Sequence, residues 1–298
     1  MIGWKPLLDP EELTRLHATS GTLSPKTVGA FQQQIYSRYH STPRPMPWRT
    51  THDPYAILVS EIMLQQTQVD RVKIKYAEFL SSFPALAALA SAPLTDVLRI
   101  WQGLGYNRRA IALKRCAEEI VSRYAGRFPS DTAELETLTG IGPYTARAVA
   151  AFAFGIAEPL IETNIRTVFI HFYFHGRDTV HDREIMPLVA ATLDRRNPRE
   201  WYYALMDFGA MLKQRHPNPG RRSRHHVKQS RFEGSNRQMR SRLLRAVIAG
   251  QGSSVAELAV LLGAEQEDVQ RNLADMEREG FLCQINCGYR IPDTEEKG

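Results

Sequence analysis

Apolar residues recur at helical spacing along most of the first 213 residues of this 298-residue chain, whereas sustained period-two alternation is scarce. Side chains three and four residues apart share one face of an α-helix, so this pattern indicates amphipathic helices. The sequence therefore predicts an all-α main body over residues 1–213. Its clearest predicted helices are residues 93–101, 109–124, 131–138, 144–154 and 184–193.

Composition narrows the class of protein. The chain is 43% hydrophobic and 23% charged, which is typical of a globular protein with a substantial core. It has no run of about 18 apolar residues and no signal-peptide pattern at its start, so we expect a cytoplasmic protein with no membrane partner. Its three cysteines, Cys116, Cys283 and Cys287, are too sparse for a disulfide framework and are expected to be small core residues.

Basic residues concentrate in one stretch. Between Gln214 and Arg245 there are ten Lys or Arg and one acid, whereas residues 257–298 hold ten acids and four bases. Residues 214–235 lack apolar periodicity and predict a basic loop or linker. Residues 236–298 are expected to form a small winged-helix domain. Its predicted parts are three helices at 237–249, 254–262 and 265–279 and a hairpin within 281–291.

The segment Leu138–Val149 combines a Gly-x-Gly turn with a helix start at Pro143. Gly140 and Gly142 allow a tight turn whose N–H groups point outward, directly before the helix N-terminus. Such N–H groups and the positive end of the helix dipole bind anions, including a DNA phosphate. A helix–turn–helix with a packing role alone has the same pattern, so the turn by itself is weak evidence.

The hairpin resembles the helix-hairpin-helix element of the HhH-GPD superfamily of DNA glycosylases. Four further segments, in the family's order, resemble its MutY-type adenine glycosylases: Pro47–Arg49, Asp53–Tyr55, Leu58–Thr67 and Trp101–Tyr106. The resemblance implies a fold of two helical lobes. Residues 48–158 would form one lobe with the hairpin, and 1–47 with 159–213 the second. In this superfamily the hairpin carbonyls often also hold a monovalent cation.

The resemblance assigns the chemistry to two carboxylates. Glu61 matches the general acid that protonates N7 of a flipped adenine, and Glu162 matches the carboxylate that stabilises positive charge on the sugar. Asn164 matches the asparagine that orients this second carboxylate. The family has Asp at the position of Glu162, so the rate or substrate changes unless the backbone compensates for the longer side chain. Taken alone, Glu61 also fits a helix position favoured by the dipole.

Other matches concern the DNA strands. Tyr144 stands where bifunctional relatives such as endonuclease III carry the lysine that forms a Schiff base, so a monofunctional enzyme is expected. Tyr144 itself is expected either to hydrogen-bond to the sugar or carboxylate, or to pack. Tyr106 matches an aromatic that intercalates beside the opposite base, although an isolated tyrosine is more often a core residue. The remaining expected DNA contacts are Arg49, Gln65, Gln66, Thr67, Gly140, Gly142 and Thr145.

Two features of these relatives, the iron–sulfur cysteines and the Nudix-like C-terminal domain, have no match in this sequence. The positions in register with four [4Fe–4S] cysteines hold Lys213, Gly220, Ser223 and Gln229, so no cluster is expected. In the basic loop, phosphate contacts are expected instead, unless the loop is a solvated linker; the candidates are Arg221, Arg222 and Arg224. The winged helix stands where relatives carry a Nudix-like domain. Because its third helix is acidic, we expect it to bind a protein or to pack rather than to read DNA.

The leading interpretation is a monomeric, monofunctional, nucleoid-associated glycosylase. It would act on double-stranded DNA and remove adenine mispaired with 8-oxoguanine or guanine. Two alternatives stay open: a related glycosylase that removes thymine from T·G, and a non-catalytic protein that binds or signals DNA damage. Thymine has no N7 to protonate, so Glu61 argues against the first alternative.

Overall fold

The computed structural model describes residues 8–226, 231–250, 254–286 and 288–292, and its helices confirm the predicted all-α class. The chain divides into two compact units. Unit 1 comprises Met1–Ile57, Ser130–Thr132 and Gly142–Lys228, and unit 2 comprises Leu58–Pro129, Ala133–Ile141 and Gln229–Gly298. This division differs from the predicted lobes, because residues 48–57, 130–132 and 142–158 group with unit 1 and residues 229–298 with unit 2.

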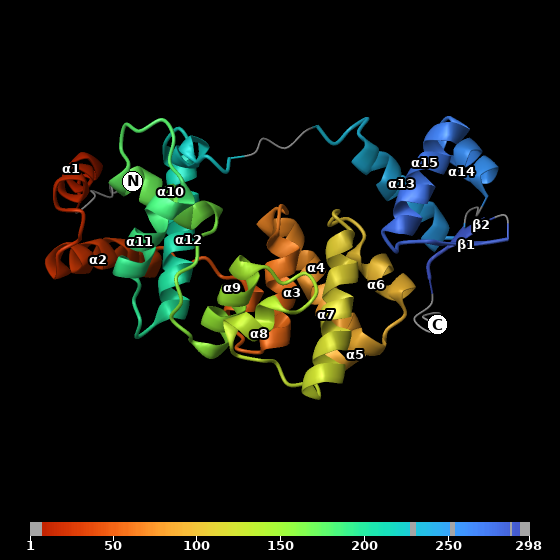
Figure 1. Ribbon diagram of the computed structural model, residues 1–298, viewed down its shortest axis with the longest axis horizontal. Helices are drawn as coiled ribbons and strands as arrows, with labels where there is room; N and C mark the ends of the chain where they lie inside the picture. Colours follow the sequence, from red (N-terminus) through yellow and green to blue (C-terminus); the bar gives the residue numbers. More distant parts are fainter. Residues whose placement is uncertain (1–7, 227–230, 251–253, 287, 293–298) are drawn as a thin grey trace. The chain divides into compact units, whose positions relative to one another are not determined.

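Unit 1 is built around helix α10 (Thr163–Tyr173), whose repeated apolar residues bury most of its surface. Around it pack α1 (Pro10–Ser20), α11 (Asp182–Thr192), α12 (Pro198–Arg215) and the 3-10 turn η2 (Pro219–Arg222) (Figure 1). The ring of Phe31 lies 5.4 to 6.0 Å from four aromatic rings of α10 and α12. The unit also contains α2 (Pro25–Ser41), η1 (Pro47–Arg49) and α9 (Pro143–Phe154).

In unit 2, helix α6 (Leu94–Trp101) shows how the apolar pattern directs packing. Its buried side chains Leu94, Val97, Leu98 and Trp101 follow helical spacing and face α4 and α7. Helix α3, by contrast, is buried on all sides from Tyr55 to Met63. The helices of this part are α3 (Pro54–Leu64), α4 (Val69–Ser82), α5 (Leu86–Ser91), α7 (Arg108–Tyr124) and α8 (Thr132–Glu136).

The C-terminal segment (residues 231–292) contains three helices followed by a hairpin, in the predicted order (Figure 1). Ser254 caps the second helix in a reciprocal capping box with Glu257. Strand β1 pairs antiparallel with β2, and Asn286 takes a positive φ of 52° at the turn. The elements are α13 (Asn236–Ile248), α14 (Val255–Leu262), α15 (Gln266–Arg278), β1 (Cys283–Ile285) and β2 (Gly288–Arg290).

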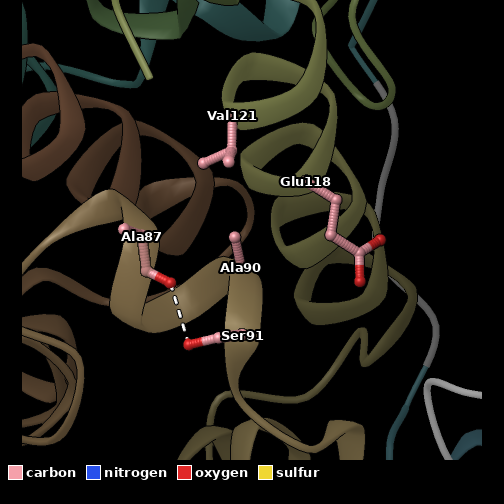
Figure 2. A pocket seen from close by; sticks show the side chains of 5 residues that line it. All are labelled: Ala87, Ala90, Ser91, Glu118 and Val121. Atoms are coloured by element: carbon pink, nitrogen blue, oxygen red, sulfur yellow. Dashed lines mark hydrogen bonds between the residues drawn. The ribbon is translucent and has the colours of Figure 1, made fainter. Parts of the chain in front are cut away.

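A shallow hollow lies beside α5 and α7, lined by Ala87, Ala90, Ser91, Glu118 and Val121 (Figure 2). The Ser91 hydroxyl donates to the carbonyl of Ala87, which is a hydrogen bond within α5. These residues include no predicted catalytic or DNA-binding position. In the part of the chain that the structure describes, no helix combines the length and apolar character needed to cross a bilayer.

Candidate catalytic and DNA-binding residues

Glu162 occupies the N-cap of α10, and its carboxylate is held by the start of that helix. Its Oε1 accepts the backbone N–H groups of Asn164 at 2.6 Å and Ile165 at 2.8 Å. Its Oε2 lies 3.3 Å from the amide nitrogen Nδ2 of Asn164. Glutamate therefore makes the N-cap bonds usually made by shorter side chains, which is how the backbone accommodates the extra methylene. The predicted pairing of Glu162 with Asn164 is present.

Lys213 extends this arrangement and was not predicted as a functional residue. Its Nζ donates to Oδ1 of Asn164 at 2.7 Å, which leaves the amide Nδ2 directed at Glu162. The close crossing of α10 and α12 makes this reach possible. Gly209 lies one turn before Lys213, and a Cβ there would meet the carbonyl oxygen of Asn164 at 2.2 Å. The signal available in the sequence was the four-residue spacing between Gly209 and Lys213, which puts them on one helix face.

The charges around Glu162 act in opposite directions. Loss of hydration raises the pKa of Glu162, whereas the two backbone N–H groups and the nearby cations Lys213 and Arg166 lower it; the net shift is upward. Burial also lowers the pKa of Lys213, partly offset by the carboxylate. Arg166 is itself fixed by two 2.7 Å bonds to Asp182. The carboxylate thus depends on a polar network drawn from α10, α11 and α12.

Glu61 lies inside α3 and only 5% of its surface is exposed. Its neighbours one turn earlier on the same helix face, Ile57 and Leu58, are fully buried. The helix backbone and its packing therefore set the position of this carboxylate.

Arg109, at the start of α7, connects the two predicted DNA-facing loops of unit 2. Its guanidinium donates to the carbonyls of Ile62 at 2.8 Å and of Gln65 at the end of α3. It also reaches the Thr67 hydroxyl at 3.2 Å and the Gly105 carbonyl at 3.1 Å. Burial lowers the pKa of Arg109 to about 10, so the group stays charged at neutral pH. Sequence reasoning missed Arg109, although it follows the Gly-Leu-Gly-Tyr motif by three residues.

Gln66 and Tyr106, both predicted to contact DNA and called the wedge residues below, have unusual backbones. Gln66 has a φ of 55° and Tyr106 a φ of 47°, in the left-handed region that side-chain-bearing residues rarely occupy. Such conformations persist where surrounding contacts fix them, and they concentrate at functional sites. Arg109 supplies those contacts here, because it bonds to both loops and lies 5.4 Å from the Tyr106 ring centroid.

The helix-hairpin-helix turn has the predicted geometry at its glycines. Gly140 has a φ of 79°, and a Cβ there would lie 2.6 Å from the Cβ of Ala112, so only glycine fits. Gly142 is the N-cap of α9, with Pro143 in the first turn and open space around its own Cα. Tyr144 is half-buried. The side chain of Thr145 is 3% exposed, so its expected DNA contact, which stays a prediction, would fall to its backbone.

Arg49 has a different role from the predicted DNA contact. Its guanidinium makes two 2.8 Å bonds to the carboxylate of Asp207 and lies 4.6 Å from the ring centroid of Tyr203. The side chain is only 10% exposed. Because its two Nη groups donate to Asp207, Arg49 forms a buried ion pair that stabilises the fold.

The basic loop is partly folded onto α10. Ser223 forms a parallel bridge with Val180, and the Arg222 guanidinium donates to the carbonyls of Phe174 at 2.8 Å and Ile170 at 3.3 Å. Arg222 thus caps the C-terminal end of α10, which corrects its assignment as a phosphate contact. Arg221 and Arg224 are exposed.

The residues at the predicted cluster positions do not fit a [4Fe–4S] cluster. They offer the Lys213 ammonium, no side chain at Gly220 and the buried Ser223 hydroxyl, whereas such a cluster needs four thiolates. A Cβ at Gly220 would lie 2.7 Å from the Thr167 hydroxyl oxygen, so the loop packs directly on α10. Gln229 lies outside the described residues.

The cysteines were expected to be core residues, and Cys116 is fully buried, with its pKa raised to about 12 by burial. Cys283 is partly exposed, which differs from that expectation, and Cys287 lies outside the described residues.

Comparisons with known proteins agree on one family. Residues 59–190 match the profile of the HhH-GPD superfamily base excision DNA repair proteins. The adenine DNA glycosylase of Mycolicibacterium smegmatis is 40% identical over 182 residues, covering 60% of this chain and 62% of the relative. That of Buchnera aphidicola subsp. Baizongia pistaciae is 35% identical over 191 residues, covering 62% and 54%. The chain therefore spans less than two thirds of the length of these curated relatives.

Solved structures agree with this match. A thermostable thymine-DNA glycosylase aligns with a TM-score of 0.56 and 27% identity, over 62% of this chain and 87% of its own. Endonuclease III in a non-covalent DNA complex aligns with a TM-score of 0.54 and 17% identity, over 63% and 86%, a likeness of fold alone. The matched residues 59–190 contain Glu61, the hairpin and Glu162, so the candidate site lies within the part of the chain that is similar to the HhH-GPD superfamily of base excision DNA repair proteins.

Proposed function

We propose that this protein is a monofunctional DNA glycosylase that removes adenine mispaired with 8-oxoguanine or guanine from double-stranded DNA. The observation that carries the proposal is the Glu162 carboxylate, fixed by two N–H groups and by Asn164 within the segment that resembles adenine DNA glycosylases. We further propose that it acts as a monomer, associated with the nucleoid.

In the proposed reaction Glu61 donates a proton to N7 of the extruded adenine, and the C1′–N9 bond breaks with its electron pair leaving on the base. The ionised Glu162 stabilises the positive sugar and accepts a proton from the water whose oxygen bonds to C1′. Glu61 ends ionised and Glu162 protonated, and exchange with solvent restores both. The products are free adenine and an abasic site.

A single duplex assay tests this proposal. We expect the protein to release adenine from a duplex containing A·8-oxoguanine and to leave a strand that breaks only after hot alkali, because Tyr144 offers no amine for a Schiff base. Strand cleavage without alkali, together with trapping by borohydride, would contradict monofunctional chemistry. Failure to release adenine would favour the non-catalytic alternative.

A second candidate function is removal of thymine from T·G mismatches, favoured by the fold likeness to a thymine-DNA glycosylase at 27% identity. Turnover of a T·G duplex in the same assay would support it. Adenine ranks first because thymine has no N7 for Glu61 to protonate.

We also propose that the enzyme works without an iron–sulfur cluster, because an ammonium, a glycine and a hydroxyl stand where thiolates are required. Stoichiometric iron with an absorbance band near ~400 nm would overturn this proposal.

A further inference from the structure

Arg237, in the first turn of α13, reaches the predicted wedge tyrosine of unit 2. Its Nη1 donates to the hydroxyl oxygen of Tyr106 at 2.8 Å, and the guanidinium centre lies 5.8 Å from the Tyr106 ring centroid. The two residues are 131 positions apart in the chain. The C-terminal segment therefore contributes a side chain to a loop that the sequence assigned to DNA contact.

A second aromatic ring lies close to the same guanidinium. Phe232 is 6.0 Å from Arg237, and 53% of its surface is exposed, against 36% for Tyr106. Aromatic rings beside arginine are the groups that stack on nucleic-acid bases. We call Tyr106, Phe232 and Arg237 the aromatic–arginine cluster.

The placement of Arg237 is anchored at the far end of the same segment. Glu279, after α15, accepts from Arg108 at 2.8 Å and from Arg240 at 2.9 Å, and these partners lower the pKa of Glu279 to about 2. Helix α13 also packs against α6. Arg108 lies two residues after Tyr106, so this ion pair fixes α13 next to the wedge loop. Glu279, one of the acidic residues that argued against DNA contact, therefore attaches the C-terminal segment to α7.

We propose that the aromatic–arginine cluster binds the nucleotide opposite the excised base, with Arg237 selecting purines that carry carbonyl oxygens. This rests on the proposed function. A guanidinium only donates hydrogen bonds, so it favours guanine O6, or O6 and O8 of 8-oxoguanine, over the amino group of adenine. Tyr106 and Phe232 supply stacking area. The opposite-base preference is then set by both the catalytic domain and the C-terminal segment.

The test measures binding by the full-length protein, so it does not require catalysis. The probes are duplexes in which a tetrahydrofuran abasic-site analogue faces 8-oxoguanine, guanine or adenine. We expect Arg237→Leu to lose roughly tenfold to hundredfold affinity for the two carbonyl-bearing bases and less than about threefold for adenine. Phe232→Ala should weaken all three, and Arg237→Lys should be intermediate because it keeps the charge without the planar fork.

The matched control is Arg242→Leu, which removes the same charge from an exposed position of α13. The Arg242 guanidinium donates to the carbonyl of Leu262. It should change all three affinities equally and slightly. An equal loss for all bases in Arg237→Leu, or no base preference in the wild type, would overturn the inference. Base-dependent binding without adenine release would instead contradict the proposed function and leave the inference standing.

Discussion

The two candidate carboxylates are held in different ways. Glu61 is carried by a helix that is buried from Tyr55 to Met63, so the packing of this one helix sets where its backbone lies. Glu162 is partly accessible and is fixed by N–H groups, the Asn164 amide and the charges of Lys213 and Arg166. For a carboxylate placed by packing, the reaction rate should respond mainly to substitution of that carboxylate itself. For a carboxylate placed by a polar network, the rate should also respond to substitution of its partners on other helices.

The largest effect is expected for Glu61→Gln. The two side chains have nearly the same volume, so α3 should pack unchanged, but the amide cannot donate the proton that the leaving base requires. Loss of a general acid costs about 10² to 10⁴ in rate. We expect single-turnover adenine excision to fall by about that factor, while mismatch affinity and melting temperature stay near wild type. Excision at the wild-type rate would show that another residue is the acid.

Substitutions of Glu162 separate charge from capping. Glu162→Gln keeps an oxygen that can accept the N–H groups of Asn164 and Ile165 but removes the negative charge, so the rate should fall about 10²-fold or more. Glu162→Asp keeps both charge and cap, and its rate should stay within about tenfold of wild type, or rise. Equal losses in the two variants would mean that carboxylate placement matters as much as its charge.

Helix positions could be predicted from the sequence because helical periodicity is local. The predicted range 93–101 corresponds to α6 (Leu94–Trp101), and 237–249 corresponds to α13 (Asn236–Ile248). Proline and glycine at the ends, together with polar caps, kept the errors to a residue or two there. The order of three helices and a hairpin was readable for the same reason.

Contacts between distant segments could not be predicted. The Arg49–Asp207 pair joins residues 158 positions apart, and the Lys213–Asn164 bond depends on the helix crossing that Gly209 permits. A motif match assigned Arg49 to DNA, and the basic composition of residues 214–235 assigned Arg222 to a phosphate. Their carbonyl and carboxylate partners appear only when the chain is folded.

A smaller effect is expected for Lys213→Met, which tests the network directly. Removing the cation leaves less to oppose the loss of hydration, so the pKa of Glu162 should rise further. Because the proposed reaction uses the ionised carboxylate, the acid limb of the pH–rate profile should move to higher pH. The rate at neutral pH should fall about tenfold, the scale of one lost charge-assisted hydrogen bond.

Lys213→Arg, which retains the charge, is the control and should restore most of the acid limb. A purely structural role of Lys213 would instead lower the melting temperature without moving the profile. The Lys213 result therefore tests whether the ionisation of Glu162 depends on its polar network.

The smallest effect concerns the loop that follows Lys213. Arg221 and Arg224 are exposed, whereas Arg222 donates to carbonyls at the end of α10. Each true phosphate contact adds about 0.9 to the slope of log affinity against log salt, so Arg221→Gln with Arg224→Gln should reduce that slope by up to ~1.8. Arg222→Gln should lower the melting temperature and leave the slope unchanged, because its donors stabilise α10. If only Arg222→Gln reduced the salt slope, Arg222 would be a phosphate contact after all. Helix α10, with Glu162 at its start, would then not depend on the Arg222 bonds for its stability.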